Sequence, residues 1–318
     1  MSFSVVICTF NREGELRKTL DSFRPIAKAD PKDWELIVVD NNSTDGTKAV
    51  CEEFRATLPL RYAFEGKQGQ AAALNHAARI AQGEVILFTD DDVVVDAQYI
   101  EGYRKTCEAE PDAAYYGGKV LSRWQGEPPR WFKENHEWLR SNPRVDFGEA
   151  SFRIDRPDAK YFIGANIAFR KSVFDGGLRF HEERGCIGRH GIANSSHSDV
   201  NFLAQEELLG QGRFGVYAPD SVVHHRDPLE RMTERYIRYF YVQNRIEQVL
   251  RGKVPDSEQR WLGAPRHLWR TVAVSSIKYA CTRWRAPSKR WLEAEVKAAA
   301  AWGDIKGFRR LRKGGASE

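Results

Sequence analysis

The chain has 318 residues, of which 42% are hydrophobic, 12% aromatic and 29% charged. This composition is ordinary for a globular protein that buries a large core, and it excludes wholesale disorder. The longest unbroken apolar run is the five residues from Ala298 to Trp302, far short of the roughly 20 that a membrane-spanning helix needs. The first residues lack the basic and apolar regions of a secretory signal, so we expect a cytoplasmic protein.

Charge is divided unevenly along the chain. Residues 229–318 hold 20 Lys and Arg against 9 Asp and Glu, whereas residues 1–228 hold 29 against 35. Five of the nine Trp residues also fall within 229–318. We therefore expect the main domain boundary near Pro228, with one domain over 1–228 and a basic, Trp-rich region over 229–318.

Two interpretations of the region 229–318 stay open. Lys and Arg with Trp are typical of an amphipathic element at a membrane surface, which would place the protein peripherally at the inner face of a membrane. Alternatively, the region is a helical appendage whose Trp residues pack on the body or on a second subunit. Charge alone would allow nucleic acid, but no recognisable nucleic-acid-binding module is present, so none is expected as a partner.

The cysteines are odd in number, widely scattered and never in a Cys-x-x-Cys pair: Cys8, Cys51, Cys107, Cys186 and Cys281. Such spacing fits neither a disulfide framework nor a zinc site. We expect reduced thiols with structural roles.

Strands alternate with helices over the first 90 residues. Apolar runs predict strands at Ser4–Cys8, Glu35–Asp40, Arg61–Phe64 and Glu84–Asp90. Helical patterns follow the first three strands, with Leu16, Leu20 and Phe23 on one apolar face, a second helix through Phe54 and a third over about 70–81. Thr9 and Asn11 are both able to cap the first helix. This alternation predicts an α/β fold with a doubly wound parallel sheet.

From about residue 115 the alternation fades. Trp124–Trp131 is rich in Trp, Pro and Gly, which favours a loop or lid. Residues 199–209 have a helical pattern, and Phe214–Pro219 and Val222–Val223 are typical of short strands. The region beyond Pro228 is predicted to be mostly helix.

Carboxylates follow two of the predicted strands. Asp40 and Asp90 each stand at the carboxyl end of an apolar strand, where ligands bind in open α/β sheets. The run Asp90, Asp91, Asp92 places three like charges in series, which a divalent cation neutralises well. The alternative is a solvated acidic turn in which Asp91 or Asp92 caps a helix.

Seven segments resemble glycosyltransferase family 2 in their order and spacing: Val5–Arg12, Val38–Thr47, Gly69–Asn75, Phe88–Asp92, Phe162–Asn166, Ser198–Phe202 and Pro219–His225. The resemblance covers about residues 3–226. It implies a GT-A fold, which is Rossmann-like with a doubly wound mixed sheet, followed here by a helical C-terminal extension. It also implies a nucleotide-binding half over about 1–115 and an acceptor half over about 116–228.

The resemblance also implies roles for individual residues. Asp40 would recognise the base or ribose, Asp92 of the DxD motif would hold the metal, and His225 would contact the metal or diphosphate. Asp199 takes the place of the catalytic base, with an N-cap of the following helix as its structural alternative. The remaining nucleotide-sugar-binding residues are Thr9, Phe10, Arg12, Asn42, Lys67, Asn75, Asp90 and Asp91. The acceptor side is formed by Gly164, Ala165 and Asn166.

Three features depart from the family pattern. Ser198 replaces an acidic residue before Asp199, and Leu74 replaces an Arg before Asn75, a loss that Lys67 or Arg12 would offset. The stretch 181–197 is longer than a simple turn and is either an acceptor loop or an ordinary surface insertion. His224, the first of the histidine pair, is expected to be a packed or solvated side chain.

These observations predict an inverting, metal-dependent glycosyltransferase of polysaccharide biosynthesis. It would transfer a hexose from a nucleotide sugar, UDP-linked, to a glycan or lipid-linked glycan, with Mn²⁺ or Mg²⁺ as cofactor. The alternatives are a non-catalytic nucleotide-sugar-binding relative and a nucleotidyltransferase. The donor sugar, acceptor, linkage and oligomeric state stay open.

Overall fold

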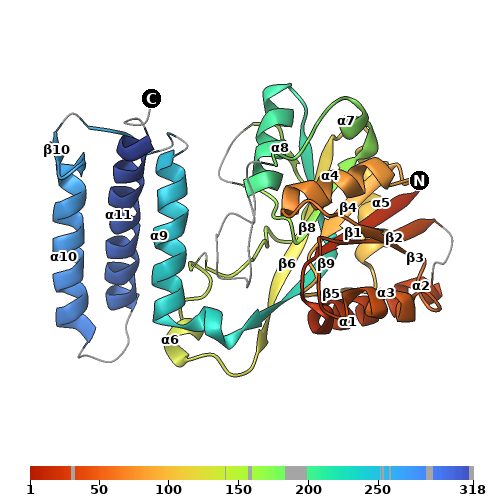
Figure 1. Cartoon of the computed structure of the whole chain (residues 1–318), viewed down its shortest axis with the longest axis horizontal. Coiled ribbons are helices and arrows are strands. Elements are labelled where there is room, and N and C mark those ends of the chain that lie inside the picture. The colour runs from red at the N-terminus through yellow and green to blue at the C-terminus, as the bar shows by residue number, and fades with distance from the viewer. Residues whose placement is uncertain are drawn as a thin grey trace. The chain divides into compact units, whose positions relative to one another are not determined.

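The computed structural model describes residues 1–29, 33–139, 141–156, 160–182, 199–250, 252, 254–257, 259–283 and 289–314. The chain forms two compact units (Figure 1). The first unit consists of residues 1–123 and 143–226, and the second of 124–142 and 227–318. The segment 124–142 therefore groups with the C-terminal residues, although it interrupts the first unit in the chain.

The first unit is built on a mixed sheet with strand order β3-β2-β1-β4-β8-β6-β9-β5 and with β7 beside β9. The strands β1 to β4 are parallel to one another, whereas β8 runs antiparallel to both β4 and β6. The strand bounds are β1 Phe3–Thr9, β2 Trp34–Asp40, β3 Leu60–Phe64, β4 Val85–Thr89, β5 Val93–Val95, β6 Tyr115–Gln125, β7 Arg153–Ile154, β8 Asn166–Arg170 and β9 Gly215–Pro228.

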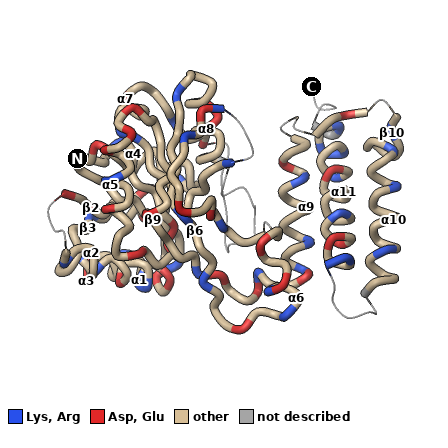
Figure 2. The backbone as a smooth tube through the Cα atoms, turned by 180° about the vertical axis from the view of Figure 1, so that it is seen from behind, with Lys and Arg blue, Asp and Glu red and all other residues tan. Residues whose placement is uncertain are grey.

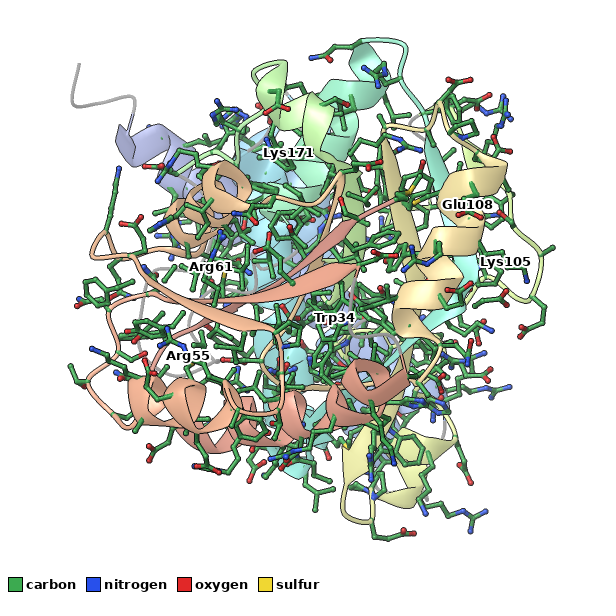
Figure 3. All side chains as sticks on the ribbon, turned by 90° about the vertical axis from the view of Figure 1, so that its right-hand side faces the viewer. Trp34, Arg55, Arg61, Lys105, Glu108 and Lys171 are labelled. Carbon is green, nitrogen blue, oxygen red and sulfur yellow. The ribbon has the colours of Figure 1, made fainter. Side chains whose placement is uncertain are left out.

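Helices cover both faces of the parallel part of this sheet (Figures 1 and 3). Helices α1 and α3 pack together on one face, and α4 packs against β1 and β2 on the other. On α5, Lys105 and Glu108 are exposed, and Trp34 at the start of β2 is buried (Figure 3). The helix bounds in this unit are α1 Glu13–Ser22, α2 Arg24–Ala29, α3 Thr47–Phe54, α4 Gln70–Ile80, α5 Tyr99–Ala109, α7 Lys171–Asp175 and α8 Asp199–Gly210.

The predicted alternation of strands and helices is confirmed, because β1 to β4 and the helices after β1, β2 and β3 all form. No strand was predicted beyond Asp92, whereas the short strand β5 follows the acidic run directly. Phe214–Pro219 and Val222–Val223 were predicted as separate short strands, but Gly215–Pro228 form one strand, β9. Different parts of β9 are held by different neighbours, β7 near Gly215 and β5 near His225, so Pro219 does not end the strand.

The stretch predicted as a loop or lid is more regular than expected. Residues 115–125 form β6, and the short helix α6 (Arg130–Lys133) begins just before Trp131. Packing explains the difference, because Trp124 and Trp131 are partly buried and pack against the hydrophobic core of the second unit.

The second unit is mostly helical, as predicted. Helix α11 packs against both α9 and α10. Gly303 and Gly307 lie one turn apart on α11, and a Cβ on them would come within 2.5 Å of the Val242 oxygen and 2.6 Å of the Val249 Cβ. These glycines therefore let α11 approach α9 closely. The elements are η1 Leu229–Met232, α9 Glu234–Leu250, β10 Arg260–Trp261, β11 Ala264–Pro265, α10 Arg266–Arg283 and α11 Lys289–Gly314.

Three of the Trp residues beyond Pro228 pack within this unit. Trp291 is buried against Trp131, and Trp269 and Trp302 border a core around Ile305. Trp284 lies outside the described residues. Among the helices of the described ranges, none combines the length and apolar character required to span a bilayer.

Four of the cysteines are described, and all four are free thiols: Cys8, Cys51, Cys107 and Cys281. Burial raises the pKa of both Cys51 and Cys107 to about 12, since desolvation disfavours the thiolate. The expectation of reduced structural thiols is confirmed for the buried cysteines, and Cys186 lies outside the described residues.

Candidate functional site

The carboxyl ends of β1, β2 and β4 meet at one edge of the sheet. Thr9 at the end of β1 pairs in register with Asp40 at the end of β2, and Ile7 pairs with Thr89 at the end of β4. The acidic run starting at Asp90 therefore begins at the same edge. Parallel strands thus bring together carboxylates that are 50 residues apart in the sequence.

Asp40 is almost fully buried, with an exposed fraction of 2%. One carboxylate oxygen accepts a hydrogen bond from the Tyr62 hydroxyl at 2.8 Å, and the other accepts one from the Ser43 N–H at 2.9 Å. Burial, and after it the hydrogen bond to Asp40 and the Asp40 charge, raises the pKa of Tyr62. The Asp40 carboxylate is therefore fixed at the sheet edge with lone pairs to spare for a ligand donor.

The loop after β1 is tied to the loop after β2. The Asn11 N–H donates to the Ser43 hydroxyl at 2.9 Å, and the Thr44 N–H donates to the Asn11 side-chain oxygen at 2.7 Å. Asn11 has a φ of 52°, in the left-handed region that Asn tolerates. The expectation that Thr9 or Asn11 caps α1 was wrong, because Arg12 is the N-cap residue and makes no side-chain capping bond. Asn11 instead joins two loops at the rim of the site.

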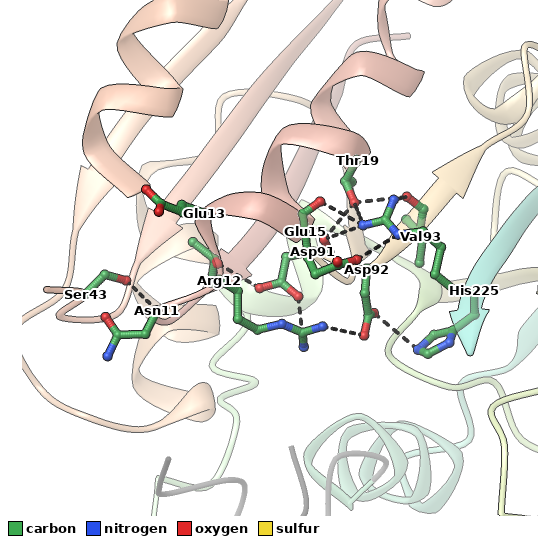
Figure 4. Close-up of polar contacts among 12 residues, drawn as sticks. Asn11, Arg12, Glu13, Glu15, Thr19, Ser43, Asp91, Asp92, Val93 and His225 are labelled. Carbon is green, nitrogen blue, oxygen red and sulfur yellow. Dashed lines mark hydrogen bonds and ion pairs between the residues drawn. The ribbon is translucent and has the colours of Figure 1, made fainter. Parts of the chain in front are cut away.

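Asp91 and Asp92 share one guanidinium (Figure 4). Arg12 contacts Asp91 at 3.2 Å and Asp92 at 2.8 Å, and the Thr9 hydroxyl donates to Asp91 at 2.7 Å. Burial raises the pKa of Asp91 to about 7, an effect that Arg12 opposes and Asp92 reinforces. The structure thus separates the two carboxylates, since Asp91 turns back to Thr9 while Asp92 also faces β9.

His225 on β9 completes an acidic cluster. Its Nε2 lies 3.2 Å from the second Asp92 oxygen, and both side chains are buried. Ligand atoms of Asp90, Asp92 and His225 lie within 4.8 Å of one another. The pairing of β9 with β5 sets this arrangement, because His225 stands opposite Val93. His224 is half-buried at the preceding strand position, which faces the other side of the sheet.

Two carboxylates and an imidazole fit a divalent cation. Such a mixed oxygen and nitrogen donor set suits Mn²⁺, whereas Mg²⁺ prefers oxygen ligands alone. The predicted ligands Asp92 and His225 are therefore brought together, with Asp90 beside them. The alternative of a solvated acidic turn that caps a helix is overturned, since Asp91 and Asp92 are buried and β5 follows them.

A buried cation that no sequence pattern predicted lies beneath this loop. Arg226 is 6% exposed, and its guanidinium donates to Glu15, to the Thr19 hydroxyl and to the carbonyls of Asp91 and Val93. The Arg226 N–H also donates to the Asp92 carbonyl at 2.8 Å. The one available signal was its place directly after His225. Arg226 holds the backbone of the acidic loop, and no residue of α1 was expected to take part.

The turn after β3 is held by Asn41, which sequence analysis did not select. Its side-chain oxygen accepts from the Gly69 N–H at 2.8 Å, and its amide donates to the Lys67 carbonyl at 2.7 Å. The predicted residue Asn42 is exposed, with a φ of 70°. The Lys67 ammonium forms an ion pair with Glu182.

Asn75 and Asn166, two of the predicted site residues, form most of their hydrogen bonds with backbone groups. Asn75 donates to the Phe180 carbonyl at 2.8 Å and accepts from the Phe180 N–H at 2.9 Å. Asn166 is fully buried, accepts from the Tyr103 hydroxyl at 2.6 Å and donates to two carbonyls of β6 and β9. Both asparagines position segments of the site.

The other predicted residues lie around the same edge. The Thr89 hydroxyl donates to the Ala165 carbonyl at 2.8 Å, which fixes the segment of Gly164 and Ala165 against the end of β4. Phe10 is half-buried. Asp199 is the first residue of α8, but its side chain, Ser198 and residues 183–197 lie outside what the structure describes.

The mixed sheet with helices on both faces defines an α/β domain of the GT-A class. Residues 4–178, just over half of the chain, match the family model described as glycosyl transferase family 2. The chain therefore belongs to glycosyl transferase family 2, and both the predicted family and the predicted fold are confirmed.

Two curated relatives illustrate the similarity. The chain is 25% identical to the glucosyl-dolichyl phosphate glucuronosyltransferase of Haloferax volcanii over 175 residues, which are 55% of this chain and 54% of that protein. It is 28% identical to the poly(ribitol-phosphate) beta-glucosyltransferase of Bacillus spizizenii over 190 residues, 58% of this chain and 28% of that protein. The match spans about half the length of these relatives or less.

Solved structures share the fold. The mannosyltransferase PcManGT from Pyrobaculum calidifontis, in complex with GDP-Man and Mn²⁺, has a TM-score of 0.53 at 20% identity, covering 99% of this chain and 79% of that chain. Staphylococcus aureus TarS in complex with UDP has a TM-score of 0.54 at 17% identity, covering 99% and 92%. At these identities the likeness shows the fold alone.

Proposed function

We propose that the protein catalyses the inverting, metal-dependent transfer of a hexose from a UDP-sugar to a glycan or lipid-linked glycan in polysaccharide biosynthesis. The observation that carries the proposal is the buried cluster of Asp90, Asp92 and His225 at the carboxyl edge, beside the Arg12 guanidinium. Relatives named as sugar transferases, and neighbouring structures solved with UDP or with GDP-Man and Mn²⁺, support it.

The donor would lie along the edge formed by β1, β2 and β4. Asp40 would recognise the base or ribose, since its carboxylate is held ready by Tyr62 and Ser43. Arg12 is the cation nearest the acidic run and would shift toward the diphosphate. The other donor-side residues that we propose are Thr9, Phe10, Asn42, Lys67, Asn75, Asp90 and Asp91.

Asp92 and His225 would hold the cation, Mn²⁺ in preference to Mg²⁺, with Asp90 beside them. When bound, the cation would act as a Lewis acid that neutralises the charge developing on the leaving diphosphate. Arg226 and Thr19 would keep the acidic loop in place during that change of charge, because they bind its carbonyls rather than its carboxylates.

On the acceptor side, Asp199 would take the proton of the attacking hydroxyl. A base on the face opposite the leaving group is what in-line displacement with inversion requires. Gln205 on the same helix is buried and exchanges two hydrogen bonds with the Phe162 backbone. This clamp fixes α8 beside the segment Gly164, Ala165 and Asn166, which we propose to form the acceptor side.

The test is to incubate the purified chain and Mn²⁺ with a set of nucleotide-sugar donors. Release of nucleoside diphosphate and the anomeric configuration of the product are measured. Asp199→Asn should lower turnover by about 10²- to 10⁴-fold while donor binding persists. Glu207→Gln, an exposed change on the same helix, is the matched control. Full turnover of Asp199→Asn, or a retained configuration, would refute the mechanism.

The non-catalytic alternative predicts a different result, which is donor binding without release of diphosphate by the wild-type chain. A nucleotidyltransferase would release pyrophosphate instead. Cytoplasmic placement, peripheral membrane contact through 229–318 and an oligomeric state stay predictions.

A further inference from the structure

The hairpin before α10 has an unusual turn. Arg260 pairs with Pro265 and Trp261 with Ala264, so Leu262 and Gly263 form a two-residue loop. Their φ angles are 48° and 84°. Positive φ at both positions is typical of a type I′ turn, which favours Asn followed by Gly. Leu at the first position is strained, and at 60% exposure it gains little from packing within this chain.

The residues beside the turn form an open hollow of aromatic and cationic side chains. A volume of about 430 Å³ is lined by Trp261, Arg266, Trp269 and Arg270. The Trp269 indole N–H donates to the Trp261 carbonyl at 2.8 Å, and the centroids of the two rings lie 5.3 Å apart. Trp261 is therefore held in place although 56% of it is exposed.

The hollow continues into the exposed face of α10. This helix packs on α11 with one side, and Val274 and Ile277 are 43% and 64% exposed on the other. Arg266, Arg270, Val274 and Ile277 follow one another at spacings of three and four residues, so they share a face. An exposed face that mixes aliphatic side chains with Arg is typical of an interfacial helix.

Charge on this face is of one sign. From residue 259 to residue 292 the sequence has eight Lys and Arg and no Asp or Glu, as Figure 2 shows for α10. Elsewhere in the unit cations are paired, for example Arg245 with Asp304 at 2.7 Å and Arg238 with Glu295. Among the described residues, Arg266 and Arg270 form no ion pair.

We propose that the hairpin tip and the exposed face of α10 dock on an anionic lipid bilayer. Trp261 and Leu262 enter the interfacial layer, and Arg266 and Arg270 bind lipid phosphate groups at the hollow. The strained Leu262 is explained by burial in lipid. A second copy of the chain is a poorer occupant, because a two-fold contact would set these arginines against their own copies. The proposal goes beyond the proposed reaction and does not depend on it.

Co-sedimentation of the full chain with vesicles tests this surface. Binding is compared for phosphatidylcholine alone and for phosphatidylcholine with phosphatidylglycerol. The wild-type chain should bind only the anionic vesicles, and high salt should release it. Arg266→Glu with Arg270→Glu should weaken binding at least about tenfold. Lys28→Glu with Arg213→Glu, two exposed cations of the first unit, gives the same charge change and should bind as wild type does.

Leu262→Asn separates lipid contact from folding. Asn before Gly suits the turn, so thermal stability should hold or rise while vesicle binding falls several-fold. The proposal is overturned if the wild type does not bind anionic vesicles, or if Arg266→Glu with Arg270→Glu and Leu262→Asn both bind them as the wild type does. It is also overturned if the chain is a dimer in sedimentation equilibrium and Leu262→Asn dissociates it, since the face would then belong to a second copy.

Discussion

Replacing Arg226 with Met removes the buried cation that holds the acidic loop. The guanidinium donates to the Glu15 carboxylate at 2.9 Å, the Glu15 carbonyl at 2.7 Å and the Val93 carbonyl at 2.9 Å, with longer contacts to Thr19 and Asp91. Met matches the aliphatic stem in size but makes none of these bonds. The loss is therefore one of hydrogen bonds and charge, with little change in packing.

The expected cost is about 3 kcal/mol of unfolding free energy, the low end for breaking a buried ion pair. Two observations explain why we expect a cost at the low end of that range. The Thr19 hydroxyl still donates its one hydrogen to the carbonyl of Asp91 or of Val93, so only one of the two carbonyls loses its donor. The Glu15 side chain is 28% exposed and keeps its bond to Lys18.

Urea unfolding followed by circular dichroism measures this loss, with Arg226→Lys as the matched variant. Lys keeps the charge but has no planar fork, so it should lose about half as much. Affinity for Mn²⁺ should fall in the Met variant as well, since the loop that carries Asp92 loses its support. A change below about 0.5 kcal/mol in the Met variant, with metal affinity intact, would refute the role assigned to Arg226.

Two further predictions concern packing and pH. Gly118→Ala should lower the free energy of unfolding by about 3 kcal/mol, because its Cβ would come within 2.2 Å of a backbone oxygen of β9. Gly14→Ala, in α1, meets open space and should raise the free energy of unfolding by about 0.5 kcal/mol. Urea unfolding midpoints compare the two variants, and equal midpoints would contradict the close packing at Gly118. Burial opposes ionisation of Glu15, but Lys18 and Arg226 outweigh it and lower its pKa. Stability from Glu15 is therefore present at neutral pH and lost as the pH falls below about 4.3, and Glu15→Gln should flatten this part of the stability profile measured by thermal unfolding.

Sequence patterns predicted the part of the fold that rests on local signals. Apolar runs ending in Asp40 and Asp90 located the strand ends, and parallel pairing then placed these carboxylates at one edge. The strand β5 was missed because three valines after three aspartates carry no period that separates strand from turn. Only pairing with β9 makes that segment a strand.

The different roles of neighbouring residues in the site could not be predicted from the sequence. Neighbouring residues such as Asp91 and Asp92 differ only in what lies opposite them, Thr9 in one case and His225 in the other. Arg226 contacts Glu15 across 211 residues of chain, and no local pattern reports such a bond. Asn42, and not Asn41, was predicted as a site residue, because the partners of Asn41 lie on the turn after β3 and no local pattern reports them.

The proposed metal-dependent nucleotide site is tested most directly by calorimetric titration with UDP, GDP, dTDP and CDP, each with Mn²⁺ and with EDTA. Wild type and Asp92→Asn are compared, with Asp96→Asn as a control outside the cluster. We expect that one nucleotide, UDP, binds tightly, that binding needs Mn²⁺, and that Asp92→Asn abolishes it while Asp96→Asn does not. Binding that ignores both EDTA and Asp92→Asn, or no binding of any nucleotide with Mn²⁺, would contradict this expectation.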